Sequence, residues 1–246
     1  MSKDEIYAND DAGERPFRFN AAVAEVFPDM LRRSIPGYAA SIEAIGSLAA
    51  RYVRPNSNCY DLGCSLGAAS IAMQAGINKH GCRIIAVDSA PAMVERCREI
   101  VQRVAEPAHA TPITVQHQDI RDTVIESAAM VVMNYTLQFL EKSDRDSMIK
   151  RIYDGMQPGG LFLLSEKVVD DDAHMEQLLV DLHHEHKRRN DYSQLEISRK
   201  RAALENVLVP ESVPVHRERL RAAGFAHTGV WLRYFNFVSI VAIKAG

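Results

Sequence analysis

Short apolar runs alternate along the chain with longer segments in which apolar residues recur every three or four positions. The short runs predict strands and the longer segments predict amphipathic helices. In chain order the pattern gives a strand at 59–62, a helix at 66–77, a strand at 83–87, a helix from 91 to about 105, strands at 113–116 and 130–133, a helix at about 143–156 and a strand at 161–165. This alternation predicts a mostly parallel sheet with helices on both faces.

Local signals mark some of the predicted element ends. Pro91 suits the first turn of its helix, and Ser143 followed by Asp146 resembles a capping arrangement for the helix that begins there. The sequence Pro158-Gly159-Gly160 predicts a turn before the strand at 161–165.

Helices are also predicted on both sides of this core. Residues 20–52 predict one or two helices broken at Pro36-Gly37, and an acidic run at 170–172 leads into helices that end near residues 189 and 208. A helix at 213–223 stops at Gly224, and the apolar runs 230–237 and 239–243 predict an antiparallel hairpin. We expect a single domain over residues 1–246, made of an N-terminal helical cap (1–55), a sheet core (56–167 and 210–246) and a helical lid (168–209).

The composition favours a globular protein that acts on small molecules. Hydrophobic residues make up 47% of the 246 positions and charged residues 25%, with a net charge of −3. The acidic balance argues against a broad electrostatic surface for nucleic acid.

The four cysteines fit a reducing compartment, because Cys59, Cys64, Cys82 and Cys97 are irregularly spaced and form no C-x-x-C pair. The first eleven residues are polar and acidic, unlike a signal peptide, and no apolar run approaches the ~18–20 residues of a membrane span. We expect a cytoplasmic protein that is neither exported nor anchored.

The most informative stretch is residues 60–67, YDLGCSLG, in which a strand ends in an acid and runs through glycines into a helix. Ligands of open α/β sheets bind at such strand ends. Gly63 allows a sharp turn, Gly67 allows close packing of the helix, and the N–H groups between them can bind a small polar or anionic group. A turn that binds nothing is about equally compatible with these two glycines alone.

Acids at the next strand ends favour a nucleoside ligand. Asp88 lies 21 residues after Gly67, where a carboxylate can accept hydrogen bonds from both ribose hydroxyls. Asp119 follows the third strand and could accept a hydrogen bond from an adenine amino group, with Ile120 packed on the ring. A single surface acid is usually solvated, but three at successive strand ends favour a pocket.

The first acid separates two classes of nucleoside cofactor. A dinucleotide fingerprint is G-x-G-x-x-G, whereas Ser65 stands at the second glycine of this chain. Asp61 would repel a pyrophosphate and attract the cationic amino-acid end of S-adenosylmethionine. NAD is therefore the weaker alternative.

These residues resemble the cofactor pocket of class I S-adenosylmethionine-dependent methyltransferase-fold enzymes. Six segments in order, over about residues 20–244, further resemble the carboxy-S-adenosyl-L-methionine synthase family. The segments are AEVFPDM (24–30), RSIPGY (33–38), YDLGCSLGAA (60–69), NYTLQFL (134–140), LSEK (164–167) and LEISRKR (195–201).

The resemblance implies a Rossmann-like, mostly parallel seven-stranded sheet and a defined reaction. In that reaction S-adenosylmethionine and prephenate give carboxy-S-adenosyl-L-methionine, phenylpyruvate and water, and no methyl group is transferred. The product serves a separate enzyme as carboxymethyl donor for wobble-uridine modification of tRNA, so this chain need not bind RNA. The resemblance also implies a homodimer. No metal is expected, because the histidine spacing does not suit one.

The family's site residues transfer to matching positions of this sequence. Their implied roles are Tyr38 at the amino-acid end of the cofactor, Gly63, Cys64 and Ser65 in the loop, Asp88 and Ser89 at the ribose and adenine, Asp119 and Ile120 at adenine, Asn134 beneath the sulfonium, and Arg201, the catalytic candidate, on the new carboxylate. The family pattern has Asn where this chain has Ser89, and we expect at most a modest change in affinity.

Arg201 also has support from its chemistry, because a carboxylate product in a half-desolvated pocket needs a fixed counter-charge and guanidinium offers a bidentate fork. The alternative is a solvated lid arginine. Arg199 and Lys200 are its neighbours, and only one or two of the three can face one pocket from a helix.

Other candidates have simpler interpretations. His183, His184 and His186 lack the spacing of a zinc site, and a solvated helix face or a position at the substrate entrance is favoured. Cys64 is expected to pack and not to act as a nucleophile.

Two further features are open to interpretation. The apolar stripe with Trp231, Phe235 and Phe237 is expected to be core or subunit interface. Asn134 is followed by Tyr-Thr-Leu and not by the Pro-Pro-aromatic sequence of amino-group methyltransferases, and it could equally cap its strand.

Three functions therefore stay open at the level of sequence. They are a carboxy-S-adenosyl-L-methionine synthase, a small-molecule methyltransferase with the same pocket, and a nucleoside-binding module without catalysis.

Overall fold

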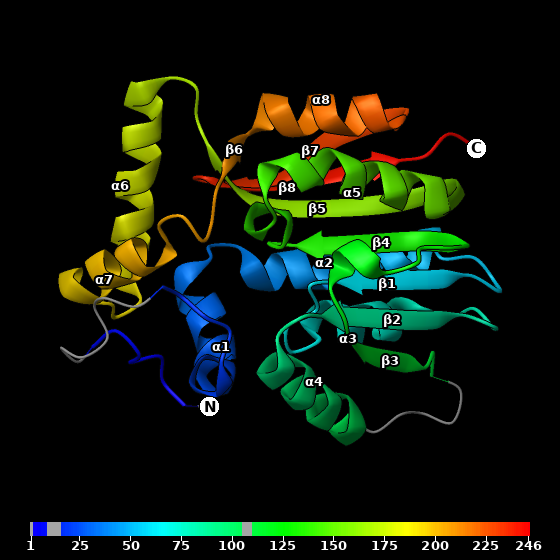
Figure 1. Cartoon of the computed structure of the whole chain (residues 1–246), viewed down its shortest axis with the longest axis horizontal. Helices are drawn as coiled ribbons and strands as arrows, with labels where there is room; N and C mark the ends of the chain where they lie inside the picture. Colours follow the sequence, from blue (N-terminus) through cyan, green and yellow to red (C-terminus); the bar gives the residue numbers. More distant parts are fainter. Residues whose placement is uncertain (1, 9–15, 105–109) are drawn as a thin grey trace.

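One twisted sheet forms the centre of the computed structural model, which describes residues 2–8, 16–104 and 110–246 (Figure 1). Its strands are β1 (Asn58–Leu62), β2 (Arg83–Asp88), β3 (Ile113–His117), β4 (Ala128–Asn134), β5 (Met156–Val169), β6 (Glu211–Ser212), β7 (His227–Tyr234) and β8 (Phe237–Ile243). The helices are α1 (Ala21–Ser34), α2 (Tyr38–Tyr52), α3 (Ala68–Gly76), α4 (Pro91–Arg103), α5 (Lys142–Gly155), α6 (Ala173–Arg189), α7 (Gln194–Leu204) and α8 (Val213–Ala223), with short 3-10 turns η2 (Ile120–Asp122) and η3 (Leu137–Phe139).

The strand order is β3-β2-β1-β4-β5-β8-β7. The first five strands of this order are parallel, β8 runs antiparallel to β5, and β7 runs antiparallel to β8. The predicted parallel sheet with an antiparallel C-terminal hairpin is therefore confirmed. Seven strands form the continuous order, and the two-residue β6, which the sequence pattern did not predict, pairs with β5 beside it.

Alternate residues of the central strands pack into two separate hydrophobic cores, one on each face of the sheet. Tyr60 and Leu62 pack with α5 and α8, whereas Cys59 packs with α2 and α3. The sheet is covered on both faces, so its central strands are apolar almost throughout, as parallel strands must be. Figure 1 shows α5 and α8 on one side of the sheet and α4 on the other.

Several predicted boundaries are wrong for identifiable reasons. The Pro158-Gly159-Gly160 turn lies inside β5, where the register with β4 shifts and Gly159 adopts φ +74°. The sequence signal for a turn therefore marks an irregular strand. Phe237 begins β8 instead of ending β7, because the turn falls at Phe235, with φ +53°, and Asn236.

Helix ends also differ in places. The predicted cap at Ser143 is wrong, because α5 begins at Lys142 after Glu141 and has no side-chain cap. Pro91 does occupy the first turn of α4, as expected. The predicted end of that helix at Ala105 lies outside the described residues.

Beyond the carboxyl ends of the parallel strands, α6 and α7 occupy the segment for which a helical lid was predicted (Figure 1). Asp172 caps α6 by accepting hydrogen bonds from the N–H groups of His174 and Met175. Ser193 and Glu196 form a capping box at the start of α7. Both helices therefore begin at residues whose side chains satisfy the first backbone donors.

A buried polar cluster ties the lid to the N-terminal segment. This Asp4 cluster consists of Asp4, Ser34, Tyr192 and Lys200. The Asp4 carboxylate accepts a hydrogen bond from the Tyr192 hydroxyl at 2.5 Å and pairs with the Lys200 ammonium at 3.5 Å, and Lys200 also donates to Ser34 Oγ at 3.2 Å. Burial lowers the pKa of Lys200 to about 8, against the opposing effect of Asp4. Both charges are paired, so the lid is held at its base by a desolvated ion pair.

Among the described residues, the model contains no helix with the length and apolar character needed to cross a membrane.

The crossing of α2 over α3 depends on two glycines. A Cβ atom at Gly76 would lie 2.0 Å from the carbonyl oxygen of Gly46, which is far closer than real contacts allow. We expect Gly76→Ala to force the helices apart and lower the free energy of unfolding by about 1–3 kcal/mol, measured by urea denaturation. Gly229→Ala is the control, because no atom lies within 4 Å of its added Cβ. Equal stability of the two variants would contradict the close-packing argument.

Candidate active site

A cavity of about 1500 Å³ lies between the carboxyl ends of the parallel strands and the lid. Every site residue predicted from the sequence lines it. These residues are Tyr38, Gly63, Cys64, Ser65, Asp88, Ser89, Asp119, Ile120, Asn134 and Arg201. The structure therefore brings together positions from the N-terminal cap, four strand ends and the lid.

The loop after β1 needs its glycines. Gly63 and Gly67 both have φ +81°, and Ser65 between them has φ +48°. A Cβ atom would lie 2.4 Å from the Thr136 side chain at Gly63 and 2.8 Å from Cys97 Sγ at Gly67. Both positions therefore have a left-handed backbone and no room for a Cβ atom, and only glycine fits both conditions.

Asp88 fixes this loop to the end of β2. Its Oδ2 accepts a hydrogen bond from the Ser65 N–H at 2.8 Å, and its Oδ1 accepts one from the Ala90 N–H at 2.9 Å. Burial raises the pKa of Asp88, and these hydrogen bonds oppose the shift. Each oxygen retains accepting capacity toward the cavity, as ribose recognition would require.

Asp61 is the more deeply buried acid, with 1% of its surface exposed. Its Oδ2 accepts hydrogen bonds from both the N–H and the hydroxyl of Ser70, at 3.0 and 2.6 Å. Burial nevertheless raises the pKa of Asp61 to about 6. Asp61 borders the same cavity as Tyr38, so a cationic group bound between them would relieve the cost of this buried charge.

The end of β4 presents an unpaired polar atom. Asn134 Oδ1 is buried and has no hydrogen-bond partner among the described residues. The next residue, Tyr135, adopts φ +63°, and the turn that follows donates the Leu137 N–H to Glu166 Oε1 at 3.0 Å. Burial raises the pKa of Glu166 to about 8. A buried carbonyl oxygen without a partner at a cavity wall is what a bound ligand would satisfy.

Asp119 already has a protein partner. Its two oxygens accept hydrogen bonds from the Arg121 guanidinium at 3.0 and 2.7 Å, and Arg121 also pairs with Asp144 at 2.8 Å. The Arg121 hydrogen bond lowers the pKa of Asp119, which stays ionised. Ile120 is buried beside it at the cavity wall.

The three consecutive basic residues of α7 point into different surroundings. Lys200 is buried in the Asp4 cluster, and Arg199 donates to the carbonyl oxygens of Tyr7 and Ala8. Arg201 lines the cavity, and its guanidinium makes no hydrogen bond or ion pair to the residues that the structure describes. The helical phase therefore singles out Arg201, which the sequence alone could not do.

Three of the four histidines of α6, His183, His184 and His186, line the cavity. His183 is buried, its Nε2 lies 2.9 Å from the Ser34 carbonyl oxygen, and its ring packs on Phe237. Of the two predicted alternatives, the solvated helix face is therefore wrong for this residue, which lines the cavity instead. His186 lies against Asn190. No group of three or more His, Cys, Asp or Glu side chains in the described ranges is arranged to hold a metal ion.

Cys64 fits the packing role expected of it. Its thiol is buried, and a hydrogen bond with Cys97 followed by burial raises its pKa well above the ordinary value. All four cysteines are buried free thiols. In the C-terminal stripe, Phe237 is core, whereas Trp231 on the edge strand β7 is partly exposed.

Sequence reasoning missed Lys167 and Tyr135 as cavity residues. Both occur in the segments that carried the family resemblance. Lys167 lies two residues beyond Ser165, which is aligned with Asn134 in the neighbouring strand. Lys167 lies near a strand end, as Asp61 and Asp88 do, so its position alone could have marked it as a cavity residue. It was not singled out because a lysine has no evident role in binding a nucleoside.

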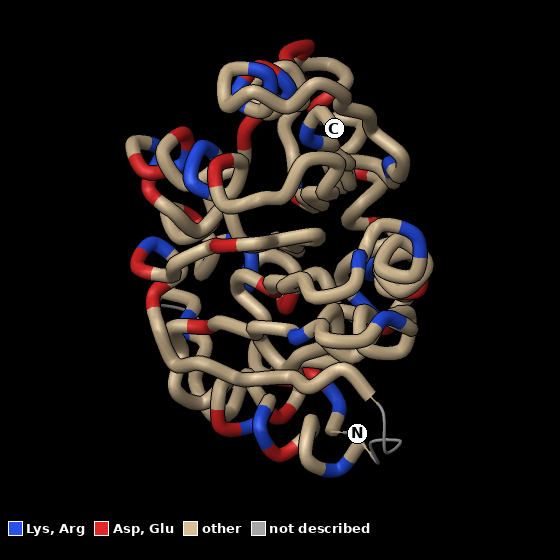
Figure 2. The backbone as a smooth tube through the Cα atoms, turned by 90° about the vertical axis from the view of Figure 1, so that its right-hand side faces the viewer, with Lys and Arg blue, Asp and Glu red and all other residues tan. Residues whose placement is uncertain are grey.

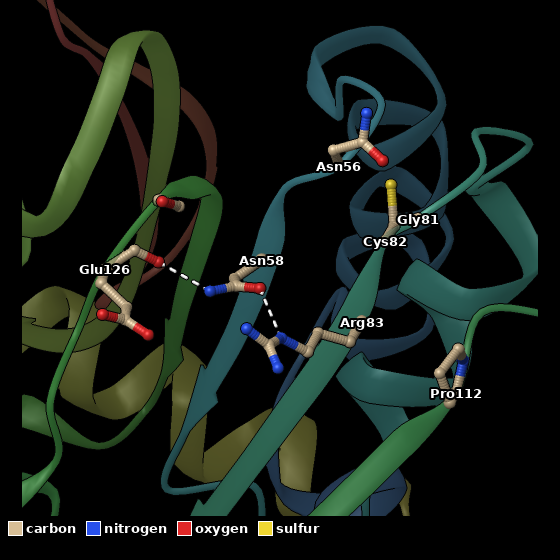
Figure 3. Close-up of a pocket in the computed structure, with 8 residues that line it drawn as sticks. Asn56, Asn58, Gly81, Cys82, Arg83, Pro112 and Glu126 are labelled. Carbon is tan, nitrogen blue, oxygen red and sulfur yellow. Dashed lines mark hydrogen bonds between the residues drawn. The ribbon is translucent and has the colours of Figure 1, made fainter.

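A second, smaller hollow of about 470 Å³ lies at the opposite, amino ends of β1 and β2 (Figure 3). Asn58 there donates to the Glu126 carbonyl oxygen at 2.8 Å and accepts from Arg83 Nε at 2.7 Å. These polar groups satisfy one another, so we assign no site to this hollow.

Comparison with known proteins agrees with this geometry. The family described as "Methyltransferase domain" matches residues 60–160. A protein of Klebsiella pneumoniae (strain 342) named carboxy-S-adenosyl-L-methionine synthase is 50% identical over 244 residues, covering 99% of this chain and 98% of its own. A protein of the same name from Aliivibrio fischeri (strain MJ11) is 53% identical over 228 residues, covering 93% of each chain.

Solved structures support the fold. Human N-acetylserotonin methyltransferase in complex with SAM superposes with a TM-score of 0.62 at 18% identity, over 92% of this chain and 56% of that one. Magnesium protoporphyrin IX methyltransferase from Synechocystis PCC 6803 gives a TM-score of 0.57 at 16% identity, over 85% and 80%. At this level of identity, the likeness establishes a methyltransferase fold and nothing more.

The buried Asp61 carboxyl predicts a pH-dependent stability difference. Its pKa of about 6 exceeds the ordinary value of 3.8, so its contribution to stability is complete below pH 4 and is lost as the pH rises through 6. Asparagine does not titrate. We therefore expect the free energy of unfolding of Asp61→Asn, relative to wild type, to be higher at pH 8 than at pH 4 by about 3 kcal/mol.

Denaturant unfolding at several pH values measures this difference. Asp171→Asn, at an exposed position before α6, is the control and should show no such trend. A pH-independent difference between Asp61→Asn and wild type would refute the assigned pKa.

Proposed function

The chain belongs to the carboxy-S-adenosyl-L-methionine synthase family, and we propose that it converts S-adenosylmethionine and prephenate to carboxy-S-adenosyl-L-methionine, phenylpyruvate and water. The observation that carries this proposal is Arg201. Its guanidinium lines the same cavity as Asp61 and Asp88, and it has no partner among the described residues. Methyl transfer leaves a neutral thioether and needs no such cation, whereas a new carboxylate does.

The reaction balances without a methyl acceptor. Prephenate loses its ring carboxylate as carbon dioxide and its ring hydroxyl as hydroxide, and the ring becomes aromatic phenylpyruvate. The methyl group of S-adenosylmethionine gives up a proton, which combines with the hydroxide to form water. The resulting carbanion, stabilised by the adjacent positive sulfur, attacks carbon dioxide and forms the new carbon–carbon bond.

The residues present fit S-adenosylmethionine by their chemistry. Asp61 and Tyr38 offer a carboxylate and a hydroxyl to the cationic amino-acid end, and the unpaired Asn134 oxygen can face the positive sulfonium. The remaining assignments are Gly63, Cys64 and Ser65 along the amino-acid portion, Asp88 and Ser89 at the ribose, Asp119 and Ile120 at adenine, and Arg201 at the carboxylate. A protein base for the methyl proton is not required, because the departing hydroxyl group of prephenate accepts it.

The apolar part of the cavity suits the carbon dioxide intermediate. Phe17, Phe19 and Phe27 give it an apolar wall, and the lid covers the strand ends. An apolar wall keeps water away from the carbanion, so the carbanion captures carbon dioxide before either is lost to solvent.

The product's destination is a separate tRNA-modifying enzyme that adds a carboxymethyl group to wobble uridine. Lys, Arg, Asp and Glu residues are interspersed over the backbone in the view of Figure 2, and the net charge is −3. Both features suit an enzyme that supplies a small molecule and does not itself bind RNA. We further propose a homodimer in the cytoplasm, where the four free thiols would stay reduced.

Mass spectrometry of reaction mixtures tests the proposed reaction. Protein incubated with S-adenosylmethionine and prephenate should produce a sulfonium heavier by the mass of carbon dioxide, and the same mixture without prephenate should not. Unchanged S-adenosylmethionine in both samples would reject the synthase. Methylation of a screened small-molecule acceptor would then establish the alternative, a small-molecule methyltransferase.

Arg201→Ala tests the residue that carries the proposal. We expect the rate of carboxy-S-adenosyl-L-methionine formation to fall by about 100-fold or more, the usual effect of removing a charge-stabilising donor, while S-adenosylmethionine binding changes little. Arg188→Ala, at an exposed lid position outside the cavity, should keep wild-type activity. A fully active Arg201→Ala variant would remove the basis of the proposal.

A further inference from the structure

Lys167 places a second cation in the cavity. It lies near the end of β5, two residues past Ser165, which is aligned with Asn134 in β4. Its backbone is fixed on both sides: its N–H donates to Gln138 Oε1 at 3.0 Å, and it pairs with Phe237 of β8 in the antiparallel ladder. Lys167 and Asn134 therefore reach the cavity from adjacent strands at one edge of the sheet.

Two further residues that line this cavity, Arg201 and His184, come from the lid. Burial lowers the pKa of Lys167, and the like charge of Arg201 lowers it further. Burial lowers the pKa of His184, and Lys187, Arg201 and Lys167 add to that shift. Lys167, His184 and Arg201 all line this cavity, so their like charges act on one another within one site.

The positive charges in this region are not balanced by the protein. The Lys167 ammonium, like the Arg201 guanidinium, makes no hydrogen bond or ion pair within the described part of the chain. Glu176 is the carboxylate that acts on Lys167. Glu176 thus stands against three cations that line the cavity, the buried Lys187, the half-buried Lys167 and the exposed Arg201. An anionic ligand with two acidic groups would restore the balance.

Prephenate has that form. Both of its carboxylates branch from one ring carbon, one attached directly and the other at the end of a pyruvyl arm. The first leaves as carbon dioxide and reappears on the sulfonium, whereas the second stays on phenylpyruvate. Two cations that line one cavity from different elements suit two carboxylates that end on different products.

We propose that Lys167 binds the pyruvyl carboxylate of prephenate, the one retained by phenylpyruvate, and that Arg201 binds the carboxylate that is transferred. This inference rests on the proposed function. The fork of Arg201 holds a carboxylate in a fixed plane, as the newly bonded group requires, while the point charge of Lys167 anchors the end of a flexible arm.

The two products provide separate probes, because each carries one of the two carboxylates. For Lys167→Met, which keeps the length of the side chain, we expect the dissociation constant of phenylpyruvate to rise by about tenfold or more and that of carboxy-S-adenosyl-L-methionine to change less than about threefold. For Arg201→Met we expect the reverse. Isothermal titration calorimetry on the whole protein measures all four values, and Lys167→Arg should recover most phenylpyruvate binding.

Each outcome is decisive. If wild-type protein forms carboxy-S-adenosyl-L-methionine but Lys167→Met binds phenylpyruvate normally, the inference fails and the proposed function stands. If both variants weaken both products equally, the cations form one shared site and the inference also fails. If wild-type protein forms no product from prephenate, the proposed function fails and the inference falls with it.

Discussion

The hydrogen bonds that Asp88 accepts from the backbone of Ser65 and Ala90 are the constraint on which the site depends. They join the end of β2 to the loop after β1 and hold Ser65 in a left-handed conformation between two glycines. The loop can then follow the cavity wall without side chains in the way. The same contacts keep a carboxylate at the strand end, although burial opposes its charge. Shape and charge of the binding wall thus come from one residue.

The buried acids that line the cavity and the cations there that have no partner among the described residues come from different elements. Asp61 and Asp88 line it at the ends of β1 and β2, whereas Lys167 of β5 and Arg201 of α7 line it together with the lid acids Glu176 and Glu205. A sulfonium with an amino group suits the first wall, and carboxylates suit the second. In the proposed function, the cofactor wall of a methyltransferase fold is kept, and Lys167 and Arg201 stand where a methyltransferase would need a base for its acceptor.

The sequence predicted the parts of the site that follow from strand ends. Asp61, Asp88 and Asp119 each come directly after an apolar run, and parallel strands bring such residues to one edge. It could not choose among Arg199, Lys200 and Arg201, because that choice depends on the rotation of α7 and on Asp4, almost two hundred residues away. Lys167 escaped notice because a lysine has no evident role in a nucleoside pocket, and the lid residues that line the same cavity follow it in the chain by 9 to 41 positions. The Pro-Gly-Gly turn failed for a similar reason: pairing of β5 with its neighbours carries the strand through a sequence that alone favours a turn.

The Asp4 cluster also bears on how the chain folds. The ion pair of Asp4 with Lys200 spans 196 positions, and the hydrogen bond with Tyr192 spans 188. Contacts so distant in sequence carry a large loop-closure cost, which is recovered only after intervening segments have condensed. The Asp4 cluster therefore joins residue 4 to residues 192 and 200 through side chains alone, and none of its contacts belongs to the sheet.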